Sequence, residues 1–404
     1  MINILDSFTK ALELDDMWKV TNINFTEEEK KFEIFVSHKK GKKYKCPECG
    51  ELCNIHDTVE RTWRDADILL YASYIHCKVP RIKCNKHKVK TVETPWARKH
   101  VGYTYRIEQT VITLAYCMTM NQIAKFLNIH DKTIANIIKR YVERKRMNLD
   151  LSHVKRIGID ETSSKRGHNY ITIFFDLDTK KIIYITEGKD NTTIDRFALF
   201  LEEHKGKRSN ITDITSDLAP AFKKGIENNF KHADVIYDKF HVIKLMNEAM
   251  DEVRRKEVVE RPELKGARYS VLKNEVNLTK KQKIKLDELN LSKTNLKTGR
   301  AYRIKLMLQE VYQQKDSIDA AKLLQKWYSW AIRSKLEPVK KVAKTIVKHF
   351  AGIVKYTEKR ISTGIVEGLN SMIQLAKRKA RGFRNVQTMI MMSYFLYGLP
   401  DEVR

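Results

Sequence analysis

Apolar and polar positions alternate in the first part of the chain and then recur at helical spacing. Residues 18–25 (WKVTNINF) and 31–38 (KFEIFVSH) have the composition of strands, and the second alternates apolar and polar side chains. Residues 101–150 indicate helices. Residues 154–187 return to strand character in three runs, VKRIGID, NYITIFFDL and KIIYITE. The pattern predicts a β-rich start, a helical segment and a second β-rich segment.

After these strands, helices and strands take turns along the chain. We expect helices over 192–204 and 219–230 and from His241, with strands at 210–217 and 233–238. Three strands joined by short links form an antiparallel meander, whereas strands separated by helices add in parallel. The prediction is a mixed sheet with helices on both faces, in the order expected of a ribonuclease-H-like core.

The net charge of the chain indicates which class of partner it binds. Its 404 residues include 77 basic and 50 acidic side chains, a net charge of +27. Such an excess favours a polyanionic partner, most often nucleic acid, with an acidic membrane surface as the alternative. Because there is no apolar run of about 18 residues and no signal-peptide pattern, we expect a soluble, cytoplasmic protein that does not bind membranes.

Five of the six cysteines lie in one N-terminal window. Cys46 and Cys49 (CPECG) share a two-residue spacing with Cys84 and His87 (CNKH). Two such knuckles separated by a β-rich stretch predict a zinc ribbon with a closed, structural Zn²⁺ site. A set of buried, inert cysteines is the competing interpretation. The fourth ligand stays open, because other candidates stand beside His87: Cys53, His56, His76 and Cys77.

Residues 119–142 (TMNQIAKFLNIHDKTIANIIKRYV) have the pattern of a helix-turn-helix. Asn128 stands where the first helix must end, and asparagine tolerates a left-handed turn. Asp131 can cap the second helix. An ordinary helical hairpin is the alternative. The expected buried stripe is Ile123, Leu127, Ile134 and Ile138, and the side chains expected to face a DNA groove are Lys132, Thr133, Asn136 and Lys139.

Three carboxylates stand at positions suited to a metal site. Asp160 ends the run RIGID, Asp217 ends ITSD, and Glu367 opens a basic helix at 363–383. Open sheets place their sites at strand ends, although such aspartates are often turn formers and a first-turn glutamate suits a helix dipole. Phosphodiester cleavage by two Mg²⁺ ions about 4 Å apart needs a few oxygen ligands. The three acids fit that chemistry.

Several motifs resemble blocks of a known family. They are GIDETSSKRGHNY, SDLAPAF, YDKFHVIKL and STGIVEGLNSMIQLAKRKARGFRN. From about Cys46 to Asn385 the chain resembles bacterial insertion-sequence transposases with an Asp-Asp-Glu site, of the ISL-three group. The resemblance implies that Asp160, Asp217 and Glu367 are catalytic residues that bind two Mg²⁺ (or Mn²⁺) ions. The sequence departs from the family pattern at CNKH (residues 84–87), where the family usually has Cys-x-x-Cys.

Related transposases have an Asp-x-x-His pair near the site, and the residues themselves suggest roles for other neighbours. His241, paired with Asp238 in DKFH, would lie near the scissile phosphate, or else be a packed histidine behind a helix-start aspartate. Glu161 should point to the opposite face from Asp160. Trp327 and Trp330 could stack on a flipped base, or belong to a core. The basic run after Glu367 is expected to grip DNA through Lys377, Arg378, Arg381 and Arg384.

The expected organisation and function follow. A Mg²⁺-dependent DNA transposase would bind terminal inverted repeats and target DNA, cleave and transfer strands, and act as a homodimer. A transcriptional regulator, or a nuclease such as a resolvase that cuts without joining, are the alternatives. The expected domains are a zinc ribbon (1–100), a helix-turn-helix (101–150), a catalytic core (151–244), a helical insertion domain (245–350) and the C-terminal helices of the core (351–404).

Overall fold

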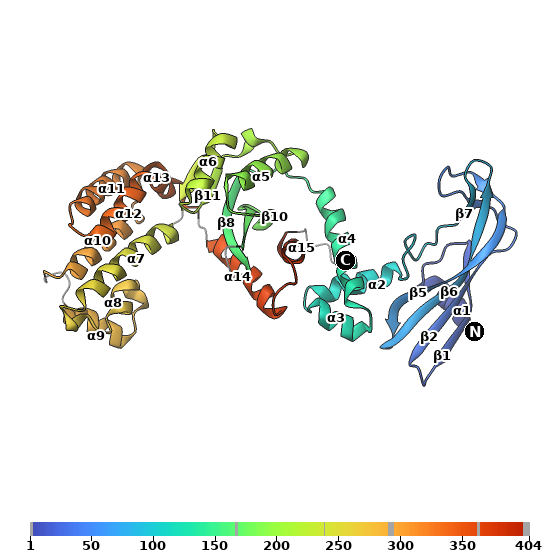
Figure 1. Ribbon diagram of the computed structural model, residues 1–404. Helices are drawn as coiled ribbons and strands as arrows, with labels where there is room; N and C mark the ends of the chain where they lie inside the picture. Colours follow the sequence, from blue (N-terminus) through green and yellow to red (C-terminus); the bar gives the residue numbers. More distant parts are fainter. Residues whose placement is uncertain (1–2, 166–168, 238, 290–294, 362–363, 399–404) are drawn as a thin grey trace. The chain divides into compact units, whose positions relative to one another are not determined.

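The computed structural model describes residues 3–165, 169–237, 239–289, 295–361 and 364–398 (Figure 1). In the helix that starts at Gly364 it does not describe the side chains of 365–367. The chain divides into two compact units, with the boundary along the sequence between Arg144 and Lys145, inside the last helix of the first unit. In the described part of the chain, no helix has both the length and the apolar character that a bilayer crossing requires.

The first unit is built on a five-stranded sheet. Its strand order is β1-β2-β6-β5, with β7 paired to the outer part of β6. The two strands expected near the N-terminus are confirmed, with bounds within one residue. Trp18, Ile34, Trp63 and Ile75 form the centre of its core. The elements are α1 (Ile4–Ala11), β1 (Trp18–Thr26), β2 (Lys31–His38), β3 (Tyr44–Lys45), β4 (Leu52–Cys53), β5 (Ile55–Ile68), β6 (Tyr71–Cys84) and β7 (Lys88–Thr91).

Three helices complete this unit: α2 (Tyr105–Ala115), α3 (Met120–Leu127) and α4 (Asp131–Met147). Thr104 caps α2, because its hydroxyl accepts a hydrogen bond from the Ile107 N–H. The same hydroxyl donates to the buried carboxylate of Asp65 on β5, at 2.6 Å. The helices are therefore attached to the sheet by a buried polar contact.

The second unit contains the mixed sheet that the element order predicted. The strand order is β10-β9-β8-β11-β12. β8, β9 and β10 pair antiparallel, whereas β11 pairs parallel with both β8 and β12. The prediction of a meander followed by parallel additions is confirmed. The strands are β8 (Arg156–Lys165), β9 (Asn169–Asp176), β10 (Lys181–Glu187), β11 (Asp213–Ser216) and β12 (Asp234–Tyr237).

Helices cover both faces of this sheet, as expected (Figure 1). On one face, Phe197 of α5 stacks on Phe174 of β9 with ring centroids 4.2 Å apart. On the other, the Tyr394 hydroxyl of α15 accepts a hydrogen bond from the Ile185 N–H of β10. The covering helices are α5 (Asn191–Glu203) and α6 (Pro220–Asn229) on the first face, and α14 (Gly364–Lys379) and α15 (Val386–Tyr397) on the second.

A helical segment with its own core stands between β12 and α14. Trp327 is fully buried in that core. The segment meets the sheet at Gly352, where a Cβ atom would lie 2.5 Å from the Tyr237 ring, so only glycine allows this approach. The helices are α7 (Lys239–Glu257), α8 (Arg268–Leu272), α9 (Lys280–Leu289), α10 (Lys297–Val311), α11 (Ser317–Ile332), α12 (Glu337–Val347) and α13 (Phe350–Lys359).

Candidate functional site

Two of the predicted carboxylates come from neighbouring strands. Thr215 of β11 pairs with Gly158 of β8 in parallel register. Asp217 and Asp160 each follow two residues after this last pair, and the charge of Asp217 acts on Asp160. β11 ends at Ser216, so Asp217 lies where the strand gives way to the turn before α6. There its carboxylate accepts a hydrogen bond from the Ala219 N–H at 3.0 Å.

The charges of two other predicted site residues, Asp217 and His241, act on the pKa of Asp160. Burial raises the pKa of Asp160 to about 6, and the negative charge of Asp217 acts in the same direction. The Glu161 N–H, which donates to Asp160 Oδ1 at 2.7 Å, and the nearby His241 lower that pKa. The structure thus brings Asp160, Asp217 and His241 within electrostatic range of one another.

Asp160 does not end its strand, and that part of the prediction is wrong. β8 continues for five residues to Lys165, because β9 pairs with it along this extension. Only the pairing with β11 stops, at Gly158. The backbone of Asp160 is therefore held by β9, while the side of β8 toward β11 is left open beyond Gly158. An edge that opens in mid-strand serves the same purpose as a strand end.

Glu161 carries a second carboxylate close to Asp217. As expected for consecutive strand residues, Asp160 and Glu161 alternate across the sheet. Burial raises the pKa of Glu161 and the charge of Asp217 raises it further, whereas Lys189 and His241 lower it. Asp217 and His241 therefore act electrostatically on Glu161 as they do on Asp160, and the sequence pattern gave no sign of this.

The third predicted carboxylate, Glu367, belongs to α14, but its side chain lies outside what the structure describes, and so does Asp238 altogether. The next turn of α14 is described. Asn370 donates a hydrogen bond from Nδ2 to Asp160 Oδ2. Gln374 donates to the Thr162 hydroxyl at 2.6 Å. Asn370 was missed as a site residue, although its spacing of three residues from Glu367 puts both positions on one side of a helix.

The basic run is divided by the end of this helix. Lys377 donates from Nζ to the Ser163 carbonyl oxygen at 3.0 Å, so it holds α14 against β8. Arg378 is exposed on the last turn. α14 ends at Lys379, earlier than expected, because Arg381 and Gly382 take left-handed φ values of 54° and 94°. Arg381 and Arg384 are exposed beyond the helix.

The helix-turn-helix has the predicted geometry. Asn128 ends α3 in the left-handed conformation, with φ 49°. A capping box between Thr119 and Gln122 starts α3. Asp131 was predicted to cap the second helix, but α4 already begins at Asp131, so the position before the helix is His130. The Lys132 N–H donates both to the His130 ring, at 3.2 Å, and to the Asp131 carboxylate, at 2.8 Å. The predicted stripe Ile123, Leu127, Ile134 and Ile138 is buried, Lys132, Asn136 and Lys139 are exposed, and Thr133 is half-buried.

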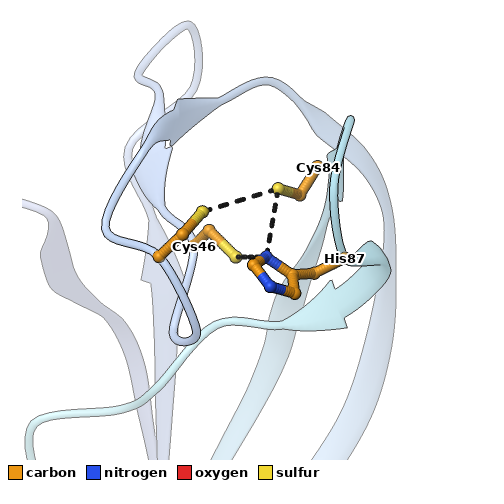
Figure 2. Close-up of side chains that lie close together, drawn as sticks. Cys46, Cys84 and His87 are labelled. Atoms are coloured by element: carbon orange, nitrogen blue, oxygen red, sulfur yellow. Dashed lines mark hydrogen bonds between the residues drawn. The ribbon is translucent and has the colours of Figure 1, made fainter.

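The predicted zinc ligands come together from two hairpins. The ligand atoms of Cys46, Cys49, Cys84 and His87 all lie within 4.8 Å of one another. Figure 2 shows Cys46, Cys84 and His87 pointing toward one another. The Cys49 and Cys84 sulfurs are 3.7 Å apart, and His87 Nδ1 lies 3.8 Å from the Cys46 sulfur and 3.7 Å from that of Cys84. Tetrahedral Zn²⁺ bonds of about 2.3 Å to sulfur and 2.0 Å to nitrogen require separations of about 3.5–3.8 Å. The donor set fits zinc.

The rival zinc ligands have other contacts. The Cys53 thiol donates to the Glu51 carbonyl oxygen at 3.4 Å. His76 Nδ1 is 2.9 Å from the Thr62 hydroxyl. Cys77 is buried in the sheet core, and burial raises the pKa of its thiol to about 12. His56 is exposed on β5. Among the residues that the structure describes, these four do not join the cluster.

The two tryptophans have different surroundings. Trp327 is fully buried, and its indole N–H donates to the Ile304 carbonyl oxygen at 2.9 Å. Trp327 is therefore a core residue and cannot stack on a base. Trp330 is half-buried and lines a surface hollow of α11 with Lys326 and Arg333.

Comparison with protein families gives three matches along the chain. A family described as "Transposase", of the ISL3 group with a DDE site, matches residues 157–393. The "helix-turn-helix domain of transposase family ISL3" matches residues 92–142. The "zinc-finger of transposase IS204/IS1001/IS1096/IS1165" matches residues 42–87, which contain all four clustered ligands. The predictions of a zinc ribbon and a helix-turn-helix are confirmed.

Whole-chain relatives agree with these matches. The transposase for insertion sequence element IS1557 of Mycobacterium tuberculosis is 30% identical, over 86% of this chain and 84% of its own length. The transposase for insertion sequence element IS1001 of Bordetella parapertussis is 27% identical, over 84% of this chain and 85% of its own. A solved simian T-cell lymphotropic virus intasome overlaps 43% of this chain and 70% of its own, at 13% identity and a TM-score of 0.17, too low to say anything about fold.

Proposed function

The chain belongs to the ISL3 family of insertion-sequence transposases, and we propose that it binds the terminal inverted repeats of its element and performs Mg²⁺-dependent strand cleavage and transfer. Its DDE domain makes it a polynucleotidyl transferase, and its helix-turn-helix domain makes it a DNA-binding protein. The finer assignments below say which of its own residues carry out each task.

The observation that carries the proposal is the electrostatic coupling of Asp160 and Asp217, which both lie two residues beyond Gly158 and Thr215, the last parallel pair of β8 and β11. Their mutual repulsion contributes to the raised pKa of Asp160. Two carboxylates held close without a neutralising cation are costly, so the arrangement suits a site that receives one. We assign Glu367 as the third ligand, because it stands one turn before Asn370, whose amide is bonded to Asp160.

Bound Mg²⁺ would activate the attacking water or 3′-hydroxyl and stabilise the leaving oxyanion. The residues of the chain prepare for this. Asn370 and the Glu161 N–H orient the two oxygens of Asp160, and the Ala219 N–H orients Asp217. His241, at the start of α7, favours the ionised form of Asp160, and we assign it the contact with the scissile phosphate.

DNA binding is assigned to two sets of side chains. The start of α4 presents Lys132, Thr133, Asn136 and Lys139, and we propose that this helix enters a major groove. The second set, Arg378, Arg381 and Arg384, is exposed, and we propose that these arginines bind the phosphates of the DNA strand that is cut. Lys377 holds α14 against β8.

The remaining assignments concern architecture. The strand order supports a ribonuclease-H-like core, and we propose that residues 245–350 form an insertion domain within it. We propose a structural role for zinc, because three cysteines and one histidine leave no open coordination position. Since two element ends must be held together, we also propose a homodimer, which light scattering of the protein bound to end DNA would test.

The test is a cleavage assay with donor DNA that carries the terminal repeats, in the presence of Mg²⁺. Asp160→Asn, Asp217→Asn and Glu367→Gln should each abolish nicking and strand transfer while leaving DNA binding intact. Glu358→Gln is a matched control on exposed α13 and should cut normally. If Glu367→Gln cuts as well as the wild type, Glu367 is not a metal ligand. If the wild type binds the repeats but never cuts or joins them, the assigned activity is wrong.

A further inference from the structure

Lysines are concentrated around the zinc cluster. Residues 39–54 and 83–90 contain nine lysines and two glutamates, a net charge of +7, roughly a quarter of the +27 of the whole chain. Lys86 pairs with Glu51 at 2.7 Å and Lys90 with Glu48 at 3.2 Å, so both acids are already neutralised. The remaining lysines of these two segments, all described, are exposed and have no acidic partner. Five of them, called the knuckle lysines below, are Lys42, Lys43, Lys45, Lys83 and Lys88.

The zinc cluster gathers the knuckle lysines into one surface. Lys45 directly precedes Cys46, Lys83 directly precedes Cys84, and Lys88 directly follows His87. The two hairpins that carry them are joined at the cluster and by the Lys83 N–H, which donates to the Asn54 carbonyl oxygen at 3.3 Å. Metal binding therefore fixes like charges that would otherwise repel one another. A polyanion that neutralises several of them at once offsets that repulsion.

A rigid strand connects this surface to the helix-turn-helix. β5 begins near the zinc cluster at Ile55 and reaches the helices at Arg64. There the Arg64 guanidinium donates to the Leu127 carbonyl oxygen, at the end of α3, at 3.1 Å. The next residue, Asp65, is fully buried and pairs with Arg106 of α2. Nine strand residues span about 30 Å, or roughly nine base pairs of duplex.

From these features we propose that the knuckle lysines form a second DNA contact, which grips the phosphate backbone about one helical turn away from the base pairs read by α4. The proposal rests on DNA binding by the helix-turn-helix. It adds that the zinc ribbon binds the same duplex, without reading its sequence, at a distance that β5 fixes. Lysine side chains that reach phosphates supply affinity and salt dependence but little specificity.

The experiment measures DNA affinity of the full chain against salt concentration, with zinc present and Mg²⁺ omitted, on a duplex of about 40 base pairs from the element end. Each phosphate contact contributes about 0.9 to the slope of log K against log salt. Replacing all five knuckle lysines by Gln should reduce the slope by about 4.5 units, and Lys42→Gln with Lys43→Gln by about 1.8. Footprinting should lose roughly one turn of protection at one side of the site.

The matched control is Lys280→Gln with Lys281→Gln, which removes the same charge from two consecutive exposed lysines of the other compact unit. Its slope should stay close to wild type. Zinc content shows whether the ribbon is intact, and Lys42 and Lys43 are not adjacent to any ligand, so their double variant remains informative if the five-lysine variant loses metal. The proposal is overturned if the Lys42/Lys43 and Lys280/Lys281 double variants have equal salt slopes. It is also overturned if replacing the knuckle lysines weakens binding to anionic vesicles but leaves the salt slope of DNA binding unchanged.

The assignment of α4 is tested separately in the same assay. Asn136→Ala should reduce the preference for the element end over unrelated DNA and leave the salt slope unchanged. If Asn136→Ala keeps that preference while the knuckle variants still flatten the slope, the reading role of α4 is wrong and the second contact stands. If Asn136→Ala behaves as expected and the knuckle variants do nothing, only the second contact is wrong.

Discussion

Replacing Asp160 by Asn should make the metal-free protein more stable while it destroys the site. The change keeps size and shape. It also keeps the hydrogen bonds: the new amide oxygen can accept the Glu161 N–H, and the new amide N–H can donate to Asn370 once the Asn370 amide turns over. Asn370 Oδ1 is buried without a hydrogen-bond partner in the structure, so turning the amide gives that atom a donor. The net change is the loss of one buried negative charge.

The magnitude follows from the pKa of Asp160, which burial raises from 3.8 to about 6. A raised carboxyl pKa means that the folded protein holds this proton more tightly than the unfolded chain. Its contribution to stability is therefore present below about pH 4 and is lost as the pH rises through 6. Two pKa units correspond to about 3 kcal/mol, and the partial exposure of Asp160 reduces this to about 1–3 kcal/mol. Asp160→Asn should gain that amount at pH 7.

The assay is urea unfolding in a chelator that removes Mg²⁺ but spares the zinc ribbon. Asp160→Asn should be more stable than wild type at pH 7 and equal to it at pH 4. Added Mg²⁺ should stabilise the wild type and leave the variant unchanged. Asp190→Asn is a control of opposite sign, because hydrogen bonds from Thr192 lower the pKa of Asp190 at the start of α5. An Asp160→Asn variant that is less stable than wild type at pH 7 would refute the reasoning.

Three further predictions concern the zinc ribbon, the helical core and the junction. Cys84→Ser should lose about one equivalent of zinc by elemental analysis, because Cys84 belongs to the four-residue cluster. Cys53→Ser should keep its zinc, because Cys53 lies outside that cluster. Trp327→Ala should cost about 3–5 kcal/mol of unfolding free energy, measured in urea, and Trp330→Ala less than about 1.5 kcal/mol, because only Trp327 is fully buried. Asp65→Ala should cost about 2–4 kcal/mol and expose the helix-turn-helix to proteolysis, since it leaves two donors without their acceptor; unchanged proteolysis would argue against a rigid junction.

Periodicity predicted the second sheet well because its signals are local. β9 and β10 are mostly apolar runs, and the linker lengths decide which neighbours can pair antiparallel. The extension of β8 beyond Asp160 could not be predicted in this way. Residues after Asp160 are polar and have strand structure only because β9 pairs with them. Tertiary pairing overrides local preference there.

The sites were predictable to different degrees. Spacing predicted the zinc site because two tight turns fix their ligands locally, but only the structure singled out His87 as the fourth ligand. The meeting of Asp160 and Asp217 required the parallel register, which the strand order implied. The bond between Asn370 and Asp160 had no sequence signal of its own, since asparagine is common on exposed helices and its partner is 210 residues away. The structure does not describe the Glu367 side chain, so its role stays a prediction.

That long separation has a consequence for synthesis on the ribosome. The first compact unit has its own core and ends at Arg144, whereas α14 begins at Gly364. At about 5–20 residues per second, the nascent chain can fold its DNA-binding unit roughly 10–40 seconds before the helix that completes the catalytic centre emerges. Under the proposed function, a chain interrupted in that interval would occupy element ends without cutting them. Premature termination would then yield a competitor of the transposase rather than an unregulated nuclease.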